Sequence, residues 1–64
     1  MTLNEILLKE NEGKKFLCRD NSFIVRNDCG TLLYLNKTFD DGTQHWKNCI
    51  ISKVWVNANY EIIG

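Results

Sequence analysis

The odd number of cysteines in a chain of only 64 residues limits most strongly how this protein can fold. Cys18, Cys29 and Cys49 cannot close a disulfide framework without a second chain. Domains this small usually depend on disulfides, a metal or self-association, because a short chain buries only about 60% of its unfolded surface. We therefore expect a single domain, residues 1–64, with a thin apolar core, and a homo-oligomer that covers the surplus apolar surface.

The cysteines leave three interpretations open. Three buried, reduced thiols are the expected one, in keeping with a protein of the cytoplasm. Zinc would require His45 and Cys49, an H-x3-C pair, to be joined by Cys18 and Cys29; zinc modules normally present a close C-x2-4-C pair, which this chain lacks. A reactive or intermolecular cysteine is the third. We expect no metal and no other cofactor.

Charge and hydropathy restrict the partners. Eight basic and eight acidic side chains cancel, whereas nucleic-acid binders usually carry a basic surplus, so nucleic acid is a disfavoured partner. No stretch approaches the roughly 20 apolar residues of a membrane span. The segment Met1 to Glu12 has neither the basic start nor the apolar run of a secretory signal. We expect a cytoplasmic protein that does not bind membranes.

The chain begins with a strong helix signal. Thr2 and Glu5 have the T-x-x-E spacing of a capping box, in which each side chain accepts the other residue's free backbone N–H. Gly13 is a natural stop, because glycine adopts the left-handed conformation without steric cost. We predict a helix from Leu3 to Glu10 or Asn11, whose apolar stripe is formed by Leu3, Ile6, Leu7 and Leu8.

Three short runs rich in aromatic, branched and leucine residues follow, and turn-forming residues separate them: Lys15 to Arg19, Phe23 to Asn27 and Thr31 to Asn36. They predict two tight hairpins and an antiparallel meander. In the third run both alternating sets, Leu33 with Leu35 and Leu32 with Tyr34, are apolar, so both faces of the sheet need cover. The predicted fold is α+β, an N-terminal helix packed on a small, barrel-like antiparallel sheet of four to six strands.

The second half of the chain is less regular. The turn Asp40-Asp41-Gly42 lies between Lys37 to Phe39 and Thr43 to Trp46, which form either an exposed hairpin or a long loop. Ser52 is a plausible N-cap for a short helix that ends at Val56. The branched residues Val54 and Val56 would also suit a strand, but we favour the helical turn. A last strand is expected from Tyr60 to Ile63.

The sequence lacks reaction chemistry. None of the phosphate-loop, dinucleotide, zinc-protease or serine-hydrolase motifs occurs, and His45 has no partner at motif spacing. Asp40 and Asp41 are the only adjacent pair of acidic residues in the chain, and we interpret them as turn residues. A catalytic cleft that excludes water would also be hard to build from so few residues. We expect a binding protein and no enzyme.

Two groups of side chains are candidates for binding. Aromatic residues give a large rigid contact area at low entropic cost, and the segment from Tyr34 to Trp46 contains Phe39 and His45 among polar neighbours. Arg19 and Arg26 lie on neighbouring predicted strands, where two guanidinium groups would match a phosphate or carboxylate. The candidate site residues are therefore Arg19, Arg26, Tyr34, Phe39, His45 and Trp46. Trp55, between two valines, is expected in the core.

The two ends of the chain contain distinctive segments: Leu3-Asn4-Glu5-Ile6-Leu7, Glu12-Gly13-Lys14-Lys15-Phe16, Arg19 and Asn59-Tyr60-Glu61-Ile62. In these segments the chain resembles a family of small phage proteins, the Thoeris anti-defence type. The resemblance implies sequestration of a cyclic ADP-ribose-type immune signal in pockets formed by an oligomer. Family members carry a tryptophan shortly after the arginine, where this chain has Asn21-Ser22-Phe23.

These observations support three hypotheses about function. The first is a non-enzymatic phage or prophage accessory protein that counteracts bacterial immunity by binding and inhibiting a host defence protein. The second is an oligomeric sponge for a cyclic nucleotide signal, using Arg19, Arg26 and an aromatic side chain. The third is a small nucleic-acid-binding regulator, which the neutral net charge makes the weakest.

Overall fold

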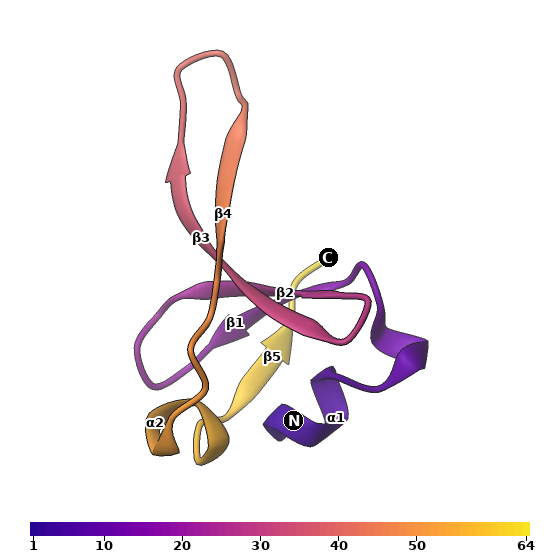
Figure 1. The fold of residues 1–64 in the computed structure, drawn as a ribbon. Helices are drawn as coiled ribbons and strands as arrows, with labels where there is room; N and C mark the ends of the chain where they lie inside the picture. The colour runs from indigo at the N-terminus through magenta and orange to yellow at the C-terminus, as the bar shows by residue number, and fades with distance from the viewer.

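The computed structural model describes all residues, 1–64, and contains one five-stranded antiparallel sheet with short helices (Figure 1). The sheet order is β4-β3-β2-β1-β5. Successive hairpins join the first four strands, and β5 returns to the far side of β1. The elements are α1 (Leu3–Ile6), a 3₁₀ turn η1 (Lys9–Asn11), β1 (Lys15–Cys18), β2 (Ile24–Asp28), β3 (Thr31–Thr38), β4 (Gln44–Asn48), α2 (Lys53–Val56) and β5 (Tyr60–Ile62).

The predicted α+β class is confirmed, but the barrel-like sheet is wrong. β4 and β5 form the two edges of an open sheet, with three strands between them. The β3–β4 hairpin projects away from the rest of the molecule instead of curling towards β5 (Figure 1). A register shift between Leu35 and Lys37 accompanies this course, and such irregularities bend and twist a strand. The sheet therefore does not close into a barrel, because β3, the longest strand, extends outwards together with β4.

The predicted N-terminal helix is present but much shorter than Leu3 to Glu10. Its capping box forms as expected: the Thr2 N–H donates to Glu5 Oε1 at 2.8 Å, and the Glu5 N–H donates to Thr2 Oγ1 at 3.3 Å. The hydrogen bond from the Thr2 N–H, followed by the Thr2 hydroxyl, lowers the pKa of the Glu5 carboxyl. The helix ends at Ile6 because Leu8 adopts an extended conformation, with φ −63° and ψ 150°.

Two buried asparagine side chains stabilise this interruption of the helix. Asn27 Nδ2 donates to the carbonyls of Ile6 and Leu8 at 2.9 and 3.1 Å, and Asn11 Nδ2 donates to the carbonyl of Glu5 at 2.7 Å. The Glu5 and Leu8 carbonyls also accept the backbone N–H groups of Leu8 and Asn11, whereas the Ile6 carbonyl has no backbone donor, and leaving it unpaired inside the protein would be costly. Helix propensity alone predicts a longer helix, because it takes no account of these bonds, which come from residues outside the helix.

We expect Thr2→Ala to lower the free energy of unfolding by about 1 kcal/mol, the usual contribution of an N-cap hydroxyl. Thr2→Ser keeps the hydroxyl oxygen that accepts the Glu5 N–H, so it serves as the matched control and should lose far less. Urea unfolding followed by circular dichroism measures both. Equal losses in the two variants would contradict the capping account.

The core lies on one face of the sheet. The register pairs Phe16 with Val25, and Cys18 with Tyr60, so these side chains point to the same side, where Leu3 and Ile6 of α1 cover them. The chain from β4 to β5 crosses this same face and adds Ala58, with Cys49 and Trp55 packed against the cluster. Neither helix covers the opposite face, because both pack against this one core.

The remaining elements are of the types that the sequence predicts. Residues 44–48 pair with β3, which confirms the hairpin over the long loop. The segment after Ser52 is helical, as favoured, and the last strand ends at Ile62. In the β2–β3 turn, Cys29 and Gly30 both have positive φ, 52° and 88°, the two-residue geometry that matches the twist of a hairpin. None of the helices has the length or apolar character needed to cross a membrane.

Candidate functional site

The structure has one pocket, and it lies beside α2 at one end of the core face. It has a volume of about 300 Å³, and five of its six lining residues are hydrophobic. They come from the turn before β2, the middle of β3, the end of β4 and the connection to β5: Phe23, Tyr34, Asn48, Cys49, Ile50 and Trp55. The fold therefore assembles this pocket from four separate segments.

Aromatic rings form its wall. The Phe23 ring stacks on Trp55 with centroids 5.9 Å apart, and it meets Tyr34 at 5.6 Å in a tilted arrangement. Phe23 is held at this position by the preceding turn, in which Ser22 has positive φ and Asn21 Oδ1 accepts the Phe23 N–H at 3.0 Å. Such pairs are individually worth about 0.5–1.5 kcal/mol beyond burial, so the wall is a preformed, rigid surface.

Exposed aliphatic side chains belong to the pocket or adjoin its residues in sequence. Ile50 of the lining is 88% exposed, and Ile51, Val54 and Phe23 are also exposed. Single exposed apolar residues are common, but several that lie around an apolar pocket are typical of an interaction surface. We name the six pocket residues together with Ile51 and Val54 the aromatic pocket surface.

The lining of this pocket is mainly apolar. Burial, followed by the nearby Cys18 thiol, raises the pKa of the Cys49 thiol, so the pocket's thiol is protonated at neutral pH. No carboxylate, lysine, arginine or histidine lines the pocket. The surface can accept an apolar side chain. None of its own residues is charged, and Lys47, which pairs with Tyr34 across β3 and β4, lies outside the pocket lining.

A second cluster lies on the sheet face that the helices leave uncovered. Lys15 of β1 and Arg26 of β2 are directly opposite each other in the sheet. Both approach the ring of Trp46 from β4: Arg26 Cζ lies 4.7 Å and Lys15 Nζ 5.9 Å from its centroid. All three side chains are half-buried. Two of the predicted site residues, Arg26 and Trp46, are thus in contact.

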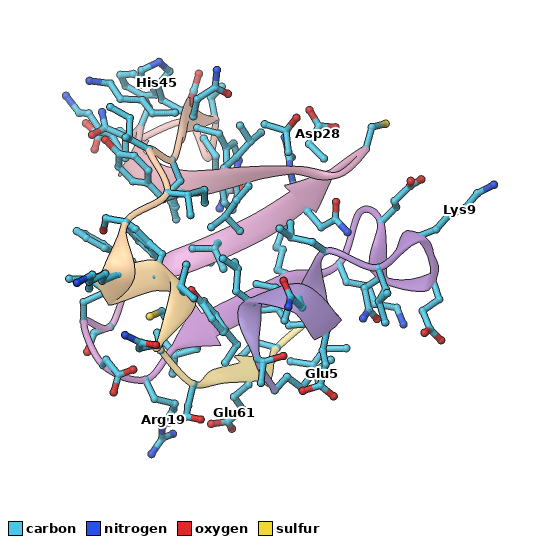
Figure 2. All side chains as sticks on the ribbon, turned by 60° about the horizontal axis from the view of Figure 1, so that its bottom comes forward. Glu5, Lys9, Arg19, Asp28, His45 and Glu61 are labelled. Carbon is cyan, nitrogen blue, oxygen red and sulfur yellow. The ribbon has the colours of Figure 1, made fainter.

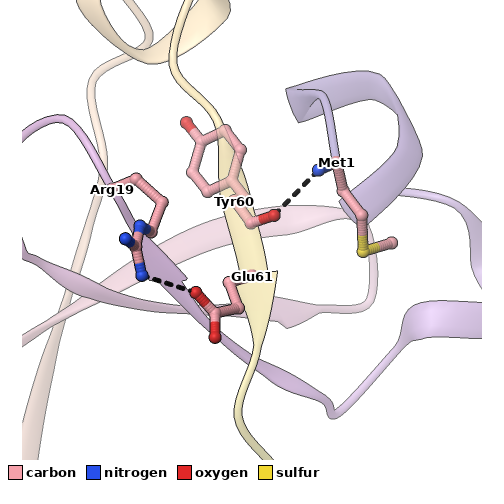
Figure 3. Close-up of polar contacts among 4 residues, drawn as sticks. All are labelled: Met1, Arg19, Tyr60 and Glu61. Carbon is pink, nitrogen blue, oxygen red and sulfur yellow. Dashed lines mark hydrogen bonds and ion pairs between the residues drawn. The ribbon is translucent and has the colours of Figure 1, made fainter.

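The predicted pairing of Arg19 with Arg26 does not form. Arg26 lies opposite Lys15, which is four residues from Arg19, a distance of about 13 Å along an extended strand. Arg19 instead donates through Nη1 to Glu61 Oε2 at 2.7 Å (Figures 2 and 3). Met1 holds the start of β5, because its amino group donates to the Tyr60 carbonyl at 2.8 Å. Arg19 therefore helps to attach β5 to β1.

Phe39 and His45 lie on the projecting hairpin, far from Arg19 and Glu61; Figure 2 shows His45 at the opposite end of the molecule. Lys37 Nζ is 5.0 Å from the centroid of Phe39, and Asn36 Nδ2 contacts His45 Nδ1 at 3.3 Å. Tyr34 belongs to the aromatic pocket surface on the core face. The six predicted residues are consequently distributed over four places and do not form a single site.

The turn between β3 and β4 has a structural explanation. Asp41 Oδ1 accepts the hydroxyl and the backbone N–H of Thr43 at 2.6 and 2.9 Å, and the hydroxyl bond contributes most to lowering the pKa of Asp41. Gly42 has φ +89°, a conformation that glycine adopts easily. Asp41 closes the turn in the way the sequence suggested.

The cysteines correct another expectation. Cys18 is buried and Cys49 half-buried, but Cys29 is exposed at the β2–β3 turn, so only one thiol is fully buried. The zinc alternative required Cys18, Cys29, Cys49 and His45 to converge. They do not: no group of three His, Cys, Asp or Glu side chains is arranged to hold a metal ion.

Sequence reasoning missed Phe23, Ile50 and Trp55 as parts of a binding surface. The sequence predicts Phe23 in an ordinary strand and Trp55 in the core, because apolar residues in regular elements are usually buried. The signal present in the sequence was the run Cys49-Ile50-Ile51 between a polar strand and a short helix, since an apolar run of that kind in a connection lacks a partner within its own element.

Comparison with known proteins gives no relative for this chain. No protein-family model matches it, and neither a curated protein nor a solved structure is significantly similar to it.

Proposed function

We propose that this chain is a non-enzymatic binding protein that recognises a partner protein through the aromatic pocket surface, and that the partner is a bacterial defence protein which a phage or prophage inhibits in this way. The observation that carries the proposal is the nearly complete exposure of Ile50 beside a rigid aromatic wall. A side chain held at 88% exposure gains most from burial in a complex, about 25 cal/mol for each Å² of apolar surface removed from water.

The lining chemistry favours a protein over a nucleotide at this surface. Five hydrophobic lining residues and no cation provide nothing to compensate the phosphates of a nucleotide. An aliphatic or aromatic side chain of a protein would fill about 300 Å³ without leaving a buried charge unpaired. Aromatic residues at the centre of an interface with aliphatic residues around them are the usual composition of a binding hot spot.

The proposal is tested by Ile50→Asp in bacteria that carry a defined immune system. The wild-type chain should restore plating of a restricted phage, and Ile50→Asp should abolish this, because a desolvated carboxylate would face the aromatic wall. The same substitution should weaken binding to the purified defence protein at least tenfold, which is about 1.4 kcal/mol.

Ile63→Asp is the matched control. Ile63 is also an exposed isoleucine, but it lies beside Lys15 at the other end of β1, so the substitution should leave both the plating and the binding unchanged. Circular dichroism confirms that each variant is folded. Wild-type activity in a folded Ile50→Asp protein would contradict the proposal.

A further inference from the structure

We propose that Lys15 and Arg26 form a binding site for a phosphate dianion on the uncovered face of the sheet, with Trp46 as the platform that positions them. The site is independent of the aromatic pocket surface. The two lie on opposite faces: Lys15, Arg26 and Trp46 share one face by strand register, and the Phe23 and Trp55 wall lies against the core face.

The first argument is that two like charges are placed together without compensation. Lys15 and Arg26 are directly opposite across β1 and β2, an arrangement that destabilises a sheet. The only ion pair of the structure is Arg19–Glu61, so neither cation forms an ion pair, although the terminal Gly64 oxygen accepts the Lys15 backbone N–H at 2.7 Å. Most of the eight basic side chains form no ion pair, and what distinguishes Lys15 and Arg26 is that they face each other directly across the sheet.

The second argument concerns hydrogen bonds. Arg26 and Lys15 are half-buried, yet neither side chain donates a hydrogen bond to any protein acceptor. Lys14 and Arg19, the more exposed cations next to β1, each have an acceptor, Asn11 and Glu61. An arginine carries its donors in a planar fork that matches two oxygens of an oxyanion.

The third argument is that the two cations are held in place. Both lie over the same indole ring, at 4.7 and 5.9 Å from its centroid, and a cation over tryptophan gains about 0.5–1 kcal/mol or more. Holding the cations before the ligand arrives lowers the entropic cost of binding. Since Arg26 already covers the ring, we assign the ligand's contacts to the cations and not to stacking on Trp46.

The charge identifies the ligand class. Two unit positive charges match a phosphate monoester or inorganic phosphate, which carry close to two negative charges at neutral pH. A phosphodiester carries only one negative charge. The ligand is therefore inorganic phosphate or a small molecule that ends in a phosphate group.

Nuclear magnetic resonance of the labelled full chain tests this site. Sodium phosphate is added at pH 7.5 while sodium chloride keeps the ionic strength constant. We expect saturable shifts of the Trp46 indole N–H and the Arg26 Nε–H. Arg26→Gln and Lys15→Gln should each weaken binding at least tenfold. Lys47→Gln is the control. Lys47 adjoins Trp46 in β4 but points to the other face of the sheet, opposite Tyr34.

Three outcomes decide the matter. Tighter binding of ribose 5-phosphate than of inorganic phosphate supports the site and identifies the anion as the end of a larger ligand. Shifts that do not saturate, or that persist unchanged in both glutamine variants, overturn the proposal. Tighter binding of a single-stranded oligonucleotide than of either phosphate overturns the assignment to a dianion. The Ile50→Asp protein should bind phosphate like wild type, so failure here is separable from failure of the proposed function.

Discussion

Asn27→Ala is expected to remove most of the stability of this protein. Asn27 is completely buried, and its amide donates to the carbonyls of Ile6 and Leu8 while its oxygen accepts the Gly30 N–H at 2.8 Å. One side chain therefore joins the end of α1 to the β2–β3 turn. A buried polar group without a partner costs about 1–3 kcal/mol, and the alanine variant removes the only side-chain partner of the Ile6 carbonyl.

The expected loss is about 2–4 kcal/mol, because the Ile6 carbonyl and the Gly30 N–H lose their partner and a small cavity forms. A single core in a chain this short provides roughly 3–5 kcal/mol in total, so little stability would remain. Urea unfolding and the dispersion of amide resonances measure the effect. Asn4→Ala, at an exposed position in α1, is the control and should change the free energy of unfolding by less than about 0.5 kcal/mol. A well-folded Asn27→Ala protein would show that water replaces the amide.

Alkaline pH is expected to unfold the protein through Tyr60. The Tyr60 side chain is buried, and its hydroxyl donates to the Trp55 carbonyl at 2.7 Å, which fastens α2 to β5. Burial raises the pKa of Tyr60 far above its usual value, and the thiols of Cys18 and Cys49 add to the shift. A phenolate cannot donate this hydrogen bond, so ionisation and loss of the folded state are coupled.

The sign follows from linkage. The pKa of Tyr60 is higher in the folded protein than in the unfolded chain, where it is about 10. The unfolded chain therefore releases the proton first, and stability that is fully present below about pH 10 decreases as the pH rises above that value. Urea midpoints measured from pH 7 upwards, with tyrosinate absorbance recorded on the same samples, test this.

Two variants separate Tyr60 from other alkaline effects. Tyr60→Phe should lose about 1 kcal/mol at neutral pH, for the missing hydrogen bond, and should lose much less on going to alkaline pH than wild type does. Tyr34→Phe removes a half-buried tyrosine without a hydrogen bond to the backbone, and it should keep the full alkaline loss. An identical pH dependence in Tyr60→Phe and wild type would refute the role assigned to this hydroxyl.

The candidate binding residues show where sequence reasoning succeeds and where it ends. Choosing Arg26 and Trp46 was possible because guanidinium groups match oxyanions and aromatic residues give a large, rigid contact area. Their contact was not predictable, since they lie on β2 and β4, and nothing local fixes which residues face each other across an intervening strand. Arg19 was paired with the wrong partner for the same reason: Glu61 is 42 residues away and reaches it only because β5 pairs with β1.

The sequence by itself determined the local elements of this protein. The Thr2 and Glu5 cap, the turns at Gly30 and Gly42, and the alternation that places Phe16 and Val25 on one face all depend on residues a few positions apart, so local chemistry specifies them. Only the tertiary structure decided where α1 ends, that the sheet remains open, and that Phe23 and Trp55 form one wall. Each of these depends on hydrogen bonds or packing between distant segments, and those contacts exist only once the whole chain has folded.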